Sequence, residues 1–410
     1  MELRPARVAI STAFFVQGLL FISLTLRLPV LQDLFDLSEL ALSGLMLMLV
    51  LLAGVGSVLA EQLAQRADSA STLRMALGVI VAGFVLLGAG SRGDGTFAIY
   101  VAGLALYGLG LGANDAASNM QAVALEHRIG RPVMPSFHGA WTAGGLLATA
   151  LAFTPMSLST AAWVLCLAPL LALAAPLLRR ATPAAPTAAP EQLGIPWSRI
   201  VLVGIALVLF YMVDTAATAW GPVYLSSGTV FDDPPTNSSM FALATLPYLA
   251  ATLLARIAGD RLTARFGAAA VVRAGALIAF AGLLVIVFAP ASTWQVGIIG
   301  FFVVGLGVAV IAPLAFSAAA RLAGDAADEA TRQARVDAVI ARFNQFNYVG
   351  ALLGAVLTGA IGSGNLRIGY AVPMVLILAL VPLARHFAGT AADTTQTAAR
   401  NSLATGPTAP

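Results

Sequence analysis

The chain has 410 residues, of which 59% are hydrophobic and 10% charged, and its mean hydropathy is +0.89. A soluble domain carries about 25% charged residues, so this composition excludes a water-soluble globular protein and predicts that most of the chain faces lipid. The formal net charge is only +3, so the positions of the arginines matter more than their sum. The single cysteine, Cys166, excludes a disulfide framework and a cysteine-based metal site.

Twelve apolar runs are long enough to cross a bilayer, which takes about 20 helical residues for roughly 30 Å of hydrocarbon. The sequence lacks the short alternating segments of a transmembrane β-barrel. It therefore predicts an all-α integral membrane protein with twelve transmembrane helices in two six-helix, pseudo-symmetric bundles. The predicted helices are 7–29, 38–60, 73–92, 96–124, 133–154, 158–178, 199–225, 238–258, 270–290, 293–320, 337–362 and 366–387.

The arginines orient these helices in the membrane. With the N-terminus inside, 19 of the 22 arginines fall on the inner side, and only Arg27, Arg92 and Arg367 fall outside. By the positive-inside rule we expect a multi-pass protein of the cytoplasmic (inner) membrane with both termini in the cytoplasm. The first run lacks a small-residue cleavage site and many runs follow it, so we expect a membrane helix and not a removed signal peptide.

Composition also divides the chain into domains. Residues 179–198 are rich in proline and alanine, which favours an extended cytoplasmic linker. This linker separates an N-terminal six-helix bundle, 1–178, from a C-terminal six-helix bundle, 199–387. The small and polar residues of 388–410 predict a disordered cytoplasmic tail.

The two bundles share a sequence repeat. Several stretches match in the same order, and equal helix number and orientation predict a parallel repeat about the membrane normal. The matching pairs are 60–74 with 259–273, "GLG" at 108–110 with 305–307, and 137–151 with 343–357.

The segment "RIAGDRLTARFG" at 256–267 resembles the signature loop of the major facilitator superfamily, which has an Asp-Arg core and further basic residues. In the first bundle the same place has Glu61-Gln62, a departure from that pattern. The resemblance implies that loop charges act as a gate and not as a substrate site. The gating residues it indicates are Arg256, Asp260, Arg261, Arg265, Glu61 and Arg66. Arg256 lies one turn before Asp260, so we expect an ion pair between them that latches the cytoplasmic face.

The runs at 110–141 and 214–225 resemble bacterial fucose-permease-like transporters. In those transporters a helix-4 carboxylate in the pattern Gly-x-x-acid-x-x-x-Asn takes part in proton coupling. Gly112, Asp115 and Asn119 match that spacing, with aspartate in place of the more usual glutamate. The resemblance therefore implies proton coupling at Asp115, and a structural acid bonded to a neighbouring asparagine is the alternative.

Charges inside membrane helices are rare and usually face a cavity, and two acids qualify, Asp115 and Asp214. Asp214 lies in a polar stripe with Tyr211, Thr218 and Gly221, and Trp220 adds an aromatic edge. This stripe favours a functional site, and an interhelical hydrogen bond is the alternative.

Other polar and aromatic groups are candidates for the same site. His138 suits a proton relay beside Trp141, or is a packing histidine. Asn344 and Tyr348 share a face of the predicted helix 337–362 and suit a hydroxylated ligand, or polar contacts between helices. The candidates are Asp115, Asp214 and His138 for proton coupling, and Asn119, Tyr211, Thr218, Trp220, Trp141, Asn344 and Tyr348 for substrate binding.

These features predict a secondary active transporter that moves a small, sugar-like solute by alternating access, with proton symport. A chain without lysine has no phosphate-binding Gly-Lys loop, so ATP does not drive it. Proton-coupled export of drugs or metabolites, and a transporter-like solute sensor, are the alternatives. Motifs of intramembrane enzymes are missing from the sequence, so we expect no enzyme, no cofactor and no metal site. The expected partners are the solute, protons and lipid, with no nucleic acid, and we expect a monomer.

Overall fold

The computed structural model of the chain is helical, and none of the residues it describes forms a strand. It describes residues 3–388 apart from 38, 94, 132, 153, 155, 175–194, 236–237, 325–328 and 363. Residues 179–194 of the predicted linker and the predicted tail beyond 388 lie outside the described residues.

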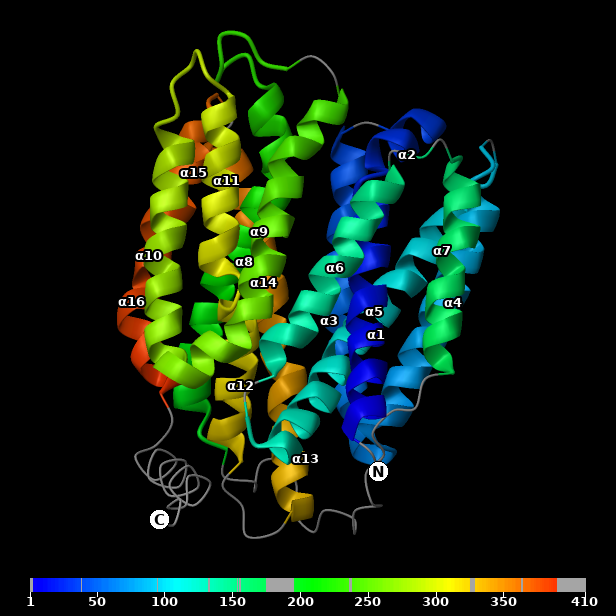
Figure 1. Cartoon of the computed structure of the whole chain (residues 1–410). Coiled ribbons are helices and arrows are strands. Elements are labelled where there is room, and N and C mark those ends of the chain that lie inside the picture. The colour runs from blue at the N-terminus through cyan, green and yellow to red at the C-terminus, as the bar shows by residue number, and fades with distance from the viewer. Residues whose placement is uncertain are drawn as a thin grey trace, which may run out of the picture.

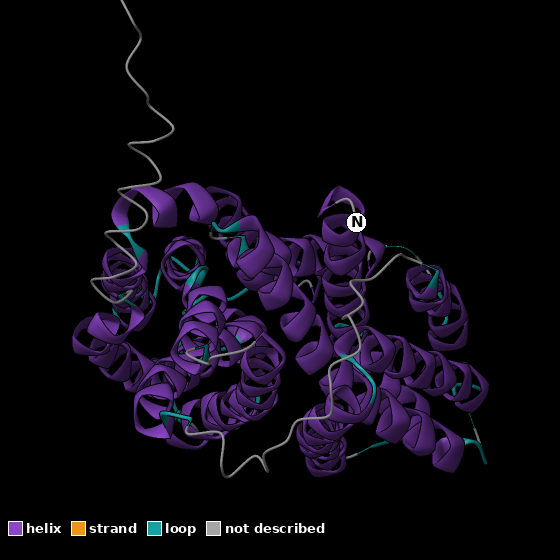
Figure 2. Cartoon of the chain, turned by 90° about the horizontal axis from the view of Figure 1, so that it is seen from below, coloured by secondary structure: helices purple, strands orange, loops and turns teal. Residues whose placement is uncertain are grey.

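The helices form two groups that lie side by side (Figures 1 and 2). The first half of the molecule, blue to bluish green in Figure 1, contains α1 (Leu3–Thr25), α2 (Leu28–Phe35), α3 (Glu39–Arg66), α4 (Ser69–Gly90), α5 (Phe97–Ile129), α6 (Met134–Ala152) and α7 (Leu158–Leu173). The second half, green to red, contains α8 (Trp197–Ser226), α9 (Ser238–Phe266), α10 (Ala268–Val287), α11 (Gln295–Val308), α12 (Ile311–Ala323), α13 (Glu329–Phe343), α14 (Gln345–Ile361), α15 (Leu366–Leu376), η2 (Ile377–Ala379), α16 (Leu380–Leu383) and η3 (Ala384–Phe387).

The N-terminal end of α1 and the C-terminal end of η3 lie at the same end of the molecule (Figure 1). We call it the lower end, from its place in that view. The opposite end, which carries α2, is the upper end. Chain ends at the same end of the molecule agree with an even number of membrane crossings.

Twelve membrane segments result, as predicted, because α11–α12, α13–α14 and α15–η3 each form one interrupted segment. In the described part of the chain, eight helical stretches are both long and apolar enough to cross a bilayer, and two of them are the interrupted segments α11–α12 and α15–η3. α7 is a shorter apolar helix of 16 residues. The all-α, twelve-segment prediction is confirmed.

Prolines account for two helix ends that the apolar runs did not reveal. The predicted helix 7–29 ends earlier, because α1 stops at Thr25 and α2 starts at Leu28. A proline ring collides with the carbonyl four residues earlier, and Pro29 stands four residues after Thr25. Likewise Pro313 stands four residues after Ala309, where the predicted helix 293–320 divides into α11 and α12.

Glycines set the close helix contacts within each half, and these contacts repeat. Gly144 of α6 packs on the backbone of Phe15 in α1, and its counterpart Gly350 of α14 packs on Val208 in α8. The predicted sequence repeat thus corresponds to equivalent helix pairs. Gly112 of α5 lies so close to α3 that an added Cβ would overlap the carbonyl oxygen of Ala53.

Candidate functional site

Asp115 lies near the middle of α5, where the two halves meet. Gln17 of α1 donates from Nε2 to Asp115 Oδ1 at 3.0 Å, and Asn119, one turn along α5, donates to the same oxygen at 3.3 Å. Asn347 of α14 donates from Nδ2 to Asp115 Oδ2 at 3.2 Å. The carboxylate therefore accepts hydrogen bonds from both halves of the molecule, and this arrangement suits a charge held at an interhelical interface.

A second carboxylate, Asp214 of α8, lies in the other half. Its Oδ1 accepts a hydrogen bond of 2.5 Å from the hydroxyl of Tyr248 in α9. Tyr211, one turn before Asp214, lies close enough to interact electrostatically with Asp115, Asp214 and Arg256. The two predicted acids and Tyr211, all half-buried, thus belong to one polar cluster.

Arg256 belongs to this cluster and not to the surface latch that its spacing predicted. It is buried, and its guanidinium donates to the carbonyl oxygens of Ala309 at 2.8 Å and His138 at 3.1 Å and contacts the Thr142 hydroxyl. The predicted ion pair between Arg256 and Asp260 is therefore wrong. The helix break before Pro313 explains why Arg256 binds the Ala309 carbonyl. Proline has no N–H to donate to that carbonyl, so its oxygen is free to accept from the guanidinium.

His138 and Trp141 occupy the α6 side of the interface. The ring of His138 is buried between Phe14, at a centroid distance of 5.1 Å, and Phe316, at 6.0 Å. Its Nε2 has no hydrogen-bond partner among the described residues. Trp141 faces Phe21 of α1 at 6.5 Å. The histidine joins the halves through its main chain, while its imidazole has aromatic neighbours.

The polar stretch of the eleventh membrane segment is divided by a helix junction at Asn344, between α13 and α14. Within the described part of the chain, Asn344 Nδ2 and the buried Tyr348 hydroxyl make no hydrogen bond. Gln345 donates to the carbonyl oxygen of Gly54 in α3 at 3.1 Å. Two polar groups at this junction therefore have no hydrogen-bond partner among the described residues.

Two further predicted residues of α8, Thr218 and Trp220, make hydrogen bonds within the protein. Thr218 donates to the main-chain oxygen of Asp214 at 2.8 Å, and Trp220 Nε1 donates to Ala355 of α14 at 2.9 Å. The indole of Trp220 also covers Gly359. In this conformation both donors are used within the protein.

Charged contacts join the halves at the lower end. Asp260 of α9 lies 3.8 Å from Arg7 of α1 and accepts from the backbone N–H of Ser136 at 3.2 Å. Glu61 of α3 pairs with Arg342 of α13 at 3.5 Å. The other predicted gating residues, Arg66, Arg261 and Arg265, have exposed side chains, and Arg265 stacks over Phe266.

Several partners of the acids were not predicted from the sequence. Gln17, Asn347 and Tyr248 supply the hydrogen bonds of the two carboxylates, and Arg7 and Arg342 pair with the gating acids. A signal existed for Gln17, an amide within the apolar run 8–22. Among the described residues, no three histidine, cysteine or acidic side chains gather in a way that could hold a metal.

Comparisons with known proteins agree on the kind of molecule. The sequence model of the Major Facilitator Superfamily matches residues 2–132. An uncharacterised transporter of Sinorhizobium fredii is 29% identical over 76% of this chain and 81% of its own length. An uncharacterised MFS-type transporter of Yersinia pestis is 26% identical over 92% of this chain and 95% of its own length.

A solved structure of FucP in the outward conformation is similar in fold, with a TM-score of 0.72 and 16% sequence identity. The similarity covers 93% of this chain and 98% of FucP. A second structure describes FucP as the fucose:proton symporter of E. coli and gives a TM-score of 0.66 at the same identity and coverage.

Proposed function

Since the chain belongs to the major facilitator superfamily of membrane transporters, we propose that it moves a small, sugar-like solute across the cytoplasmic membrane by alternating access, in symport with protons. The observation that carries this proposal is the position of Asp115. One titratable group accepts hydrogen bonds from Gln17 of the first half and Asn347 of the second. A proton that binds there acts on the contact between the halves.

The chemistry of that step follows from the hydrogen bonds. As a carboxylate, Asp115 only accepts, which suits the amide N–H donors of Gln17, Asn119 and Asn347. A proton on either oxygen turns Asp115 into a hydrogen-bond donor. That O–H then faces an amide N–H, which is also a donor. Protonation therefore weakens at least one of the amide bonds, and the loss of the Asn347 bond loosens the contact between halves.

The lower-end contacts fit one state of such a cycle. The arginine distribution supports a cytoplasmic lower end, and the contacts of Arg7, Glu61 and Arg256 across the halves lie between mid-membrane and that end. We infer a conformation closed toward the cytoplasm, in which those residues act as the gate. The similarity to the outward conformation of FucP supports the same assignment.

A sugar-like solute suits the neutral donors that remain. Asn344 and Tyr348, beside the Asp115 cluster, have polar groups without a partner among the described residues, and amides with aromatic faces are typical of sites for hydroxylated ligands. Fucose, the solute of the symporter FucP, is the first compound to examine, followed by other neutral sugars and polyols.

The test uses purified protein in proteoliposomes with radiolabelled L-fucose and a panel of neutral sugars. For a transported sugar, an inward proton gradient should drive accumulation. Asp115→Asn removes the group that binds the proton, so accumulation should fall at least about tenfold, which corresponds to a free-energy change of about 1.4 kcal/mol. Exchange without a gradient should persist, because an asparagine still accepts hydrogen bonds.

Asp232→Asn, in the exposed upper-end loop, is the matched control and should leave accumulation unchanged. Undiminished gradient-driven uptake by Asp115→Asn would refute the coupling role. Solute binding without any flux would favour a sensor, and uptake reversed to proton-driven efflux would favour an exporter.

A further inference from the structure

Arg27 lies at the upper end of the first half, with only 9% of its surface exposed. It sits in the turn between α1 and α2, and its Nη1 donates to the carbonyl oxygen of Ser23, four residues earlier, at 3.1 Å. Since α1 runs from the lower to the upper end, this bond turns the guanidinium back into the molecule. An arginine that extends toward lipid headgroups, the ordinary expectation at a helix end, points the opposite way.

The charge of Arg27 is not neutralised within the part of the chain that the structure describes. There, its hydrogen-bond acceptor is the neutral Ser23 carbonyl, and the ion pairs involve other arginines. A buried charge costs several kcal/mol unless an opposite charge accompanies it. Among the described residues, the surroundings of Arg27 therefore lack one negative charge.

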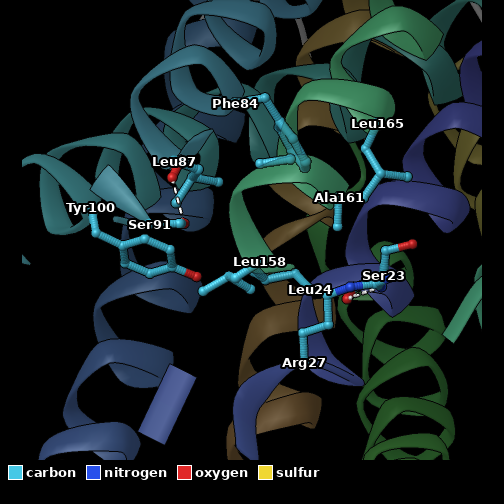
Figure 3. Close-up of a pocket in the computed structure, with 11 residues that line it drawn as sticks. Ser23, Leu24, Arg27, Phe84, Leu87, Ser91, Tyr100, Leu158, Ala161 and Leu165 are labelled. Atoms are coloured by element: carbon cyan, nitrogen blue, oxygen red, sulfur yellow. Dashed lines mark hydrogen bonds between the residues drawn. The ribbon is translucent and has the colours of Figure 1, made fainter. Parts of the chain in front are cut away.

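A small cavity opens beside this guanidinium (Figure 3). It is half open and lined by residues of α1, α4, α5 and α7, with Tyr100 and Arg27 on opposite sides and Leu158 between them. The centre of a water-sized sphere can occupy about 20 Å³ of it. A single water needs about 10–15 Å³ by the same measure, so the space suits one small ion or one to two waters.

The cavity wall offers a second unused donor. The Ser23 hydroxyl lines the cavity, is fully buried and has no hydrogen-bond partner among the described residues. The Ser91 hydroxyl is already used by the carbonyl oxygen of Leu87, at 2.6 Å. The remaining wall holds the Tyr100 hydroxyl, which points toward Leu158 in Figure 3, and is otherwise apolar, with side chains such as Phe84 and Leu165.

We propose that this cavity binds one chloride ion. The space beside the guanidinium fits a single spherical anion. The Arg27 guanidinium supplies the countercharge, and the Ser23 hydroxyl supplies a neutral hydrogen-bond donor. Apolar walls favour a weakly hydrated monovalent anion over a strongly hydrated one. The bound ion joins α1 to α4 and α7 at the upper end, away from the Asp115 cluster.

The test is thermal unfolding of the purified full chain in detergent, in sodium chloride or sodium gluconate at constant ionic strength. A ligand that binds only the folded state raises the midpoint with its concentration. We expect a saturable rise of several degrees with chloride. Ser23→Ala should increase the half-saturating chloride concentration several-fold, and Arg27→Gln should abolish the response.

Arg92→Gln is the control, because Arg92 is an exposed arginine at the same end. In gluconate, Arg27→Gln should unfold at the same temperature as the unmodified chain or higher, because it removes an unneutralised charge. If Arg27 has only a structural role, the variant should have a lower unfolding midpoint in both salts. Arg27→Lys, which keeps the charge, serves if the glutamine variant does not fold, and should retain a weaker response. Equal midpoints of the unmodified chain in both salts, a full chloride response in Arg27→Gln, or stabilisation by phosphatidylglycerol without any chloride effect would overturn the proposal.

Discussion

At the scale of single residues, the hydrogen bond between Tyr248 and Asp214 makes a sharp prediction. Tyr248→Phe removes the phenol that donates to a carboxylate inside the membrane, and leaving such a group unpaired costs about 1–3 kcal/mol. We expect a midpoint of thermal unfolding lower by several degrees. Tyr107→Phe is the matched control, because the Tyr107 hydroxyl is buried and has no partner among the described residues. Equal midpoints for the two variants would contradict the importance of the bond.

The acids of the site were predictable from sequence, while their partners were not. Asp115 and Asp214 stand out because a charge within an apolar run is rare. Asn347 and Tyr248 are neutral side chains of kinds that often join helices without further function. That Asn347 meets Asp115 depends on how the two halves dock, and no local pattern in the sequence specifies docking.

At the scale of helices, the contact between α3 and α5 depends on Gly112. Gly112→Ala places a methyl group against the carbonyl of Ala53, so the two helices must separate, and such overpacking typically costs about 1–3 kcal/mol. We expect less folded protein and a lower unfolding midpoint by fluorescence-detected size exclusion. Gly78→Ala in α4 is the control, because nothing stands within 4 Å of its added Cβ. A stable, fully expressed Gly112→Ala variant would mean that the helices tolerate separation.

Helix number and order followed from hydrophobic length, whereas the interruptions did not. The ends of α1 and α11 fall one turn before Pro29 and Pro313, so a rule based on the carbonyl four residues before a proline would have placed them. Pro222 and Pro247 show why that rule is incomplete, since both lie inside continuous helices, α8 and α9. Neighbouring helices decide whether a proline breaks a membrane helix or is accommodated.

At the scale of the whole molecule, the pair between Glu61 and Arg342 should influence which end is closed. Arg342 is half exposed, so the pair is expected to contribute less than about 1 kcal/mol, which changes the ratio of two conformations about two- to fivefold. Glu61→Arg should favour separation of the halves at the lower end, and the double exchange Glu61→Arg with Arg342→Glu should reverse much of the effect.

The separation is measurable by electron paramagnetic resonance between spin labels on Arg128→Cys of α5 and Ala264→Cys of α9, both exposed positions. The background requires Cys166→Ser, because Cys166 is a free thiol. Identical distance distributions in all three proteins would show that the pair has no part in closing this end.

Arg256 has a consequence for how this interface changes during evolution. Two of its acceptors are main-chain carbonyls, those of Ala309 and His138, which every amino acid provides. Substitutions at positions 309 and 138 therefore leave both bonds available as long as the backbone keeps its course. Correlated mutation, the usual trace of residues in contact, should be weak for these pairs. A strong constraint should instead fall on Pro313, four residues after Ala309, which interacts with Arg256 only through the shape it imposes on the chain.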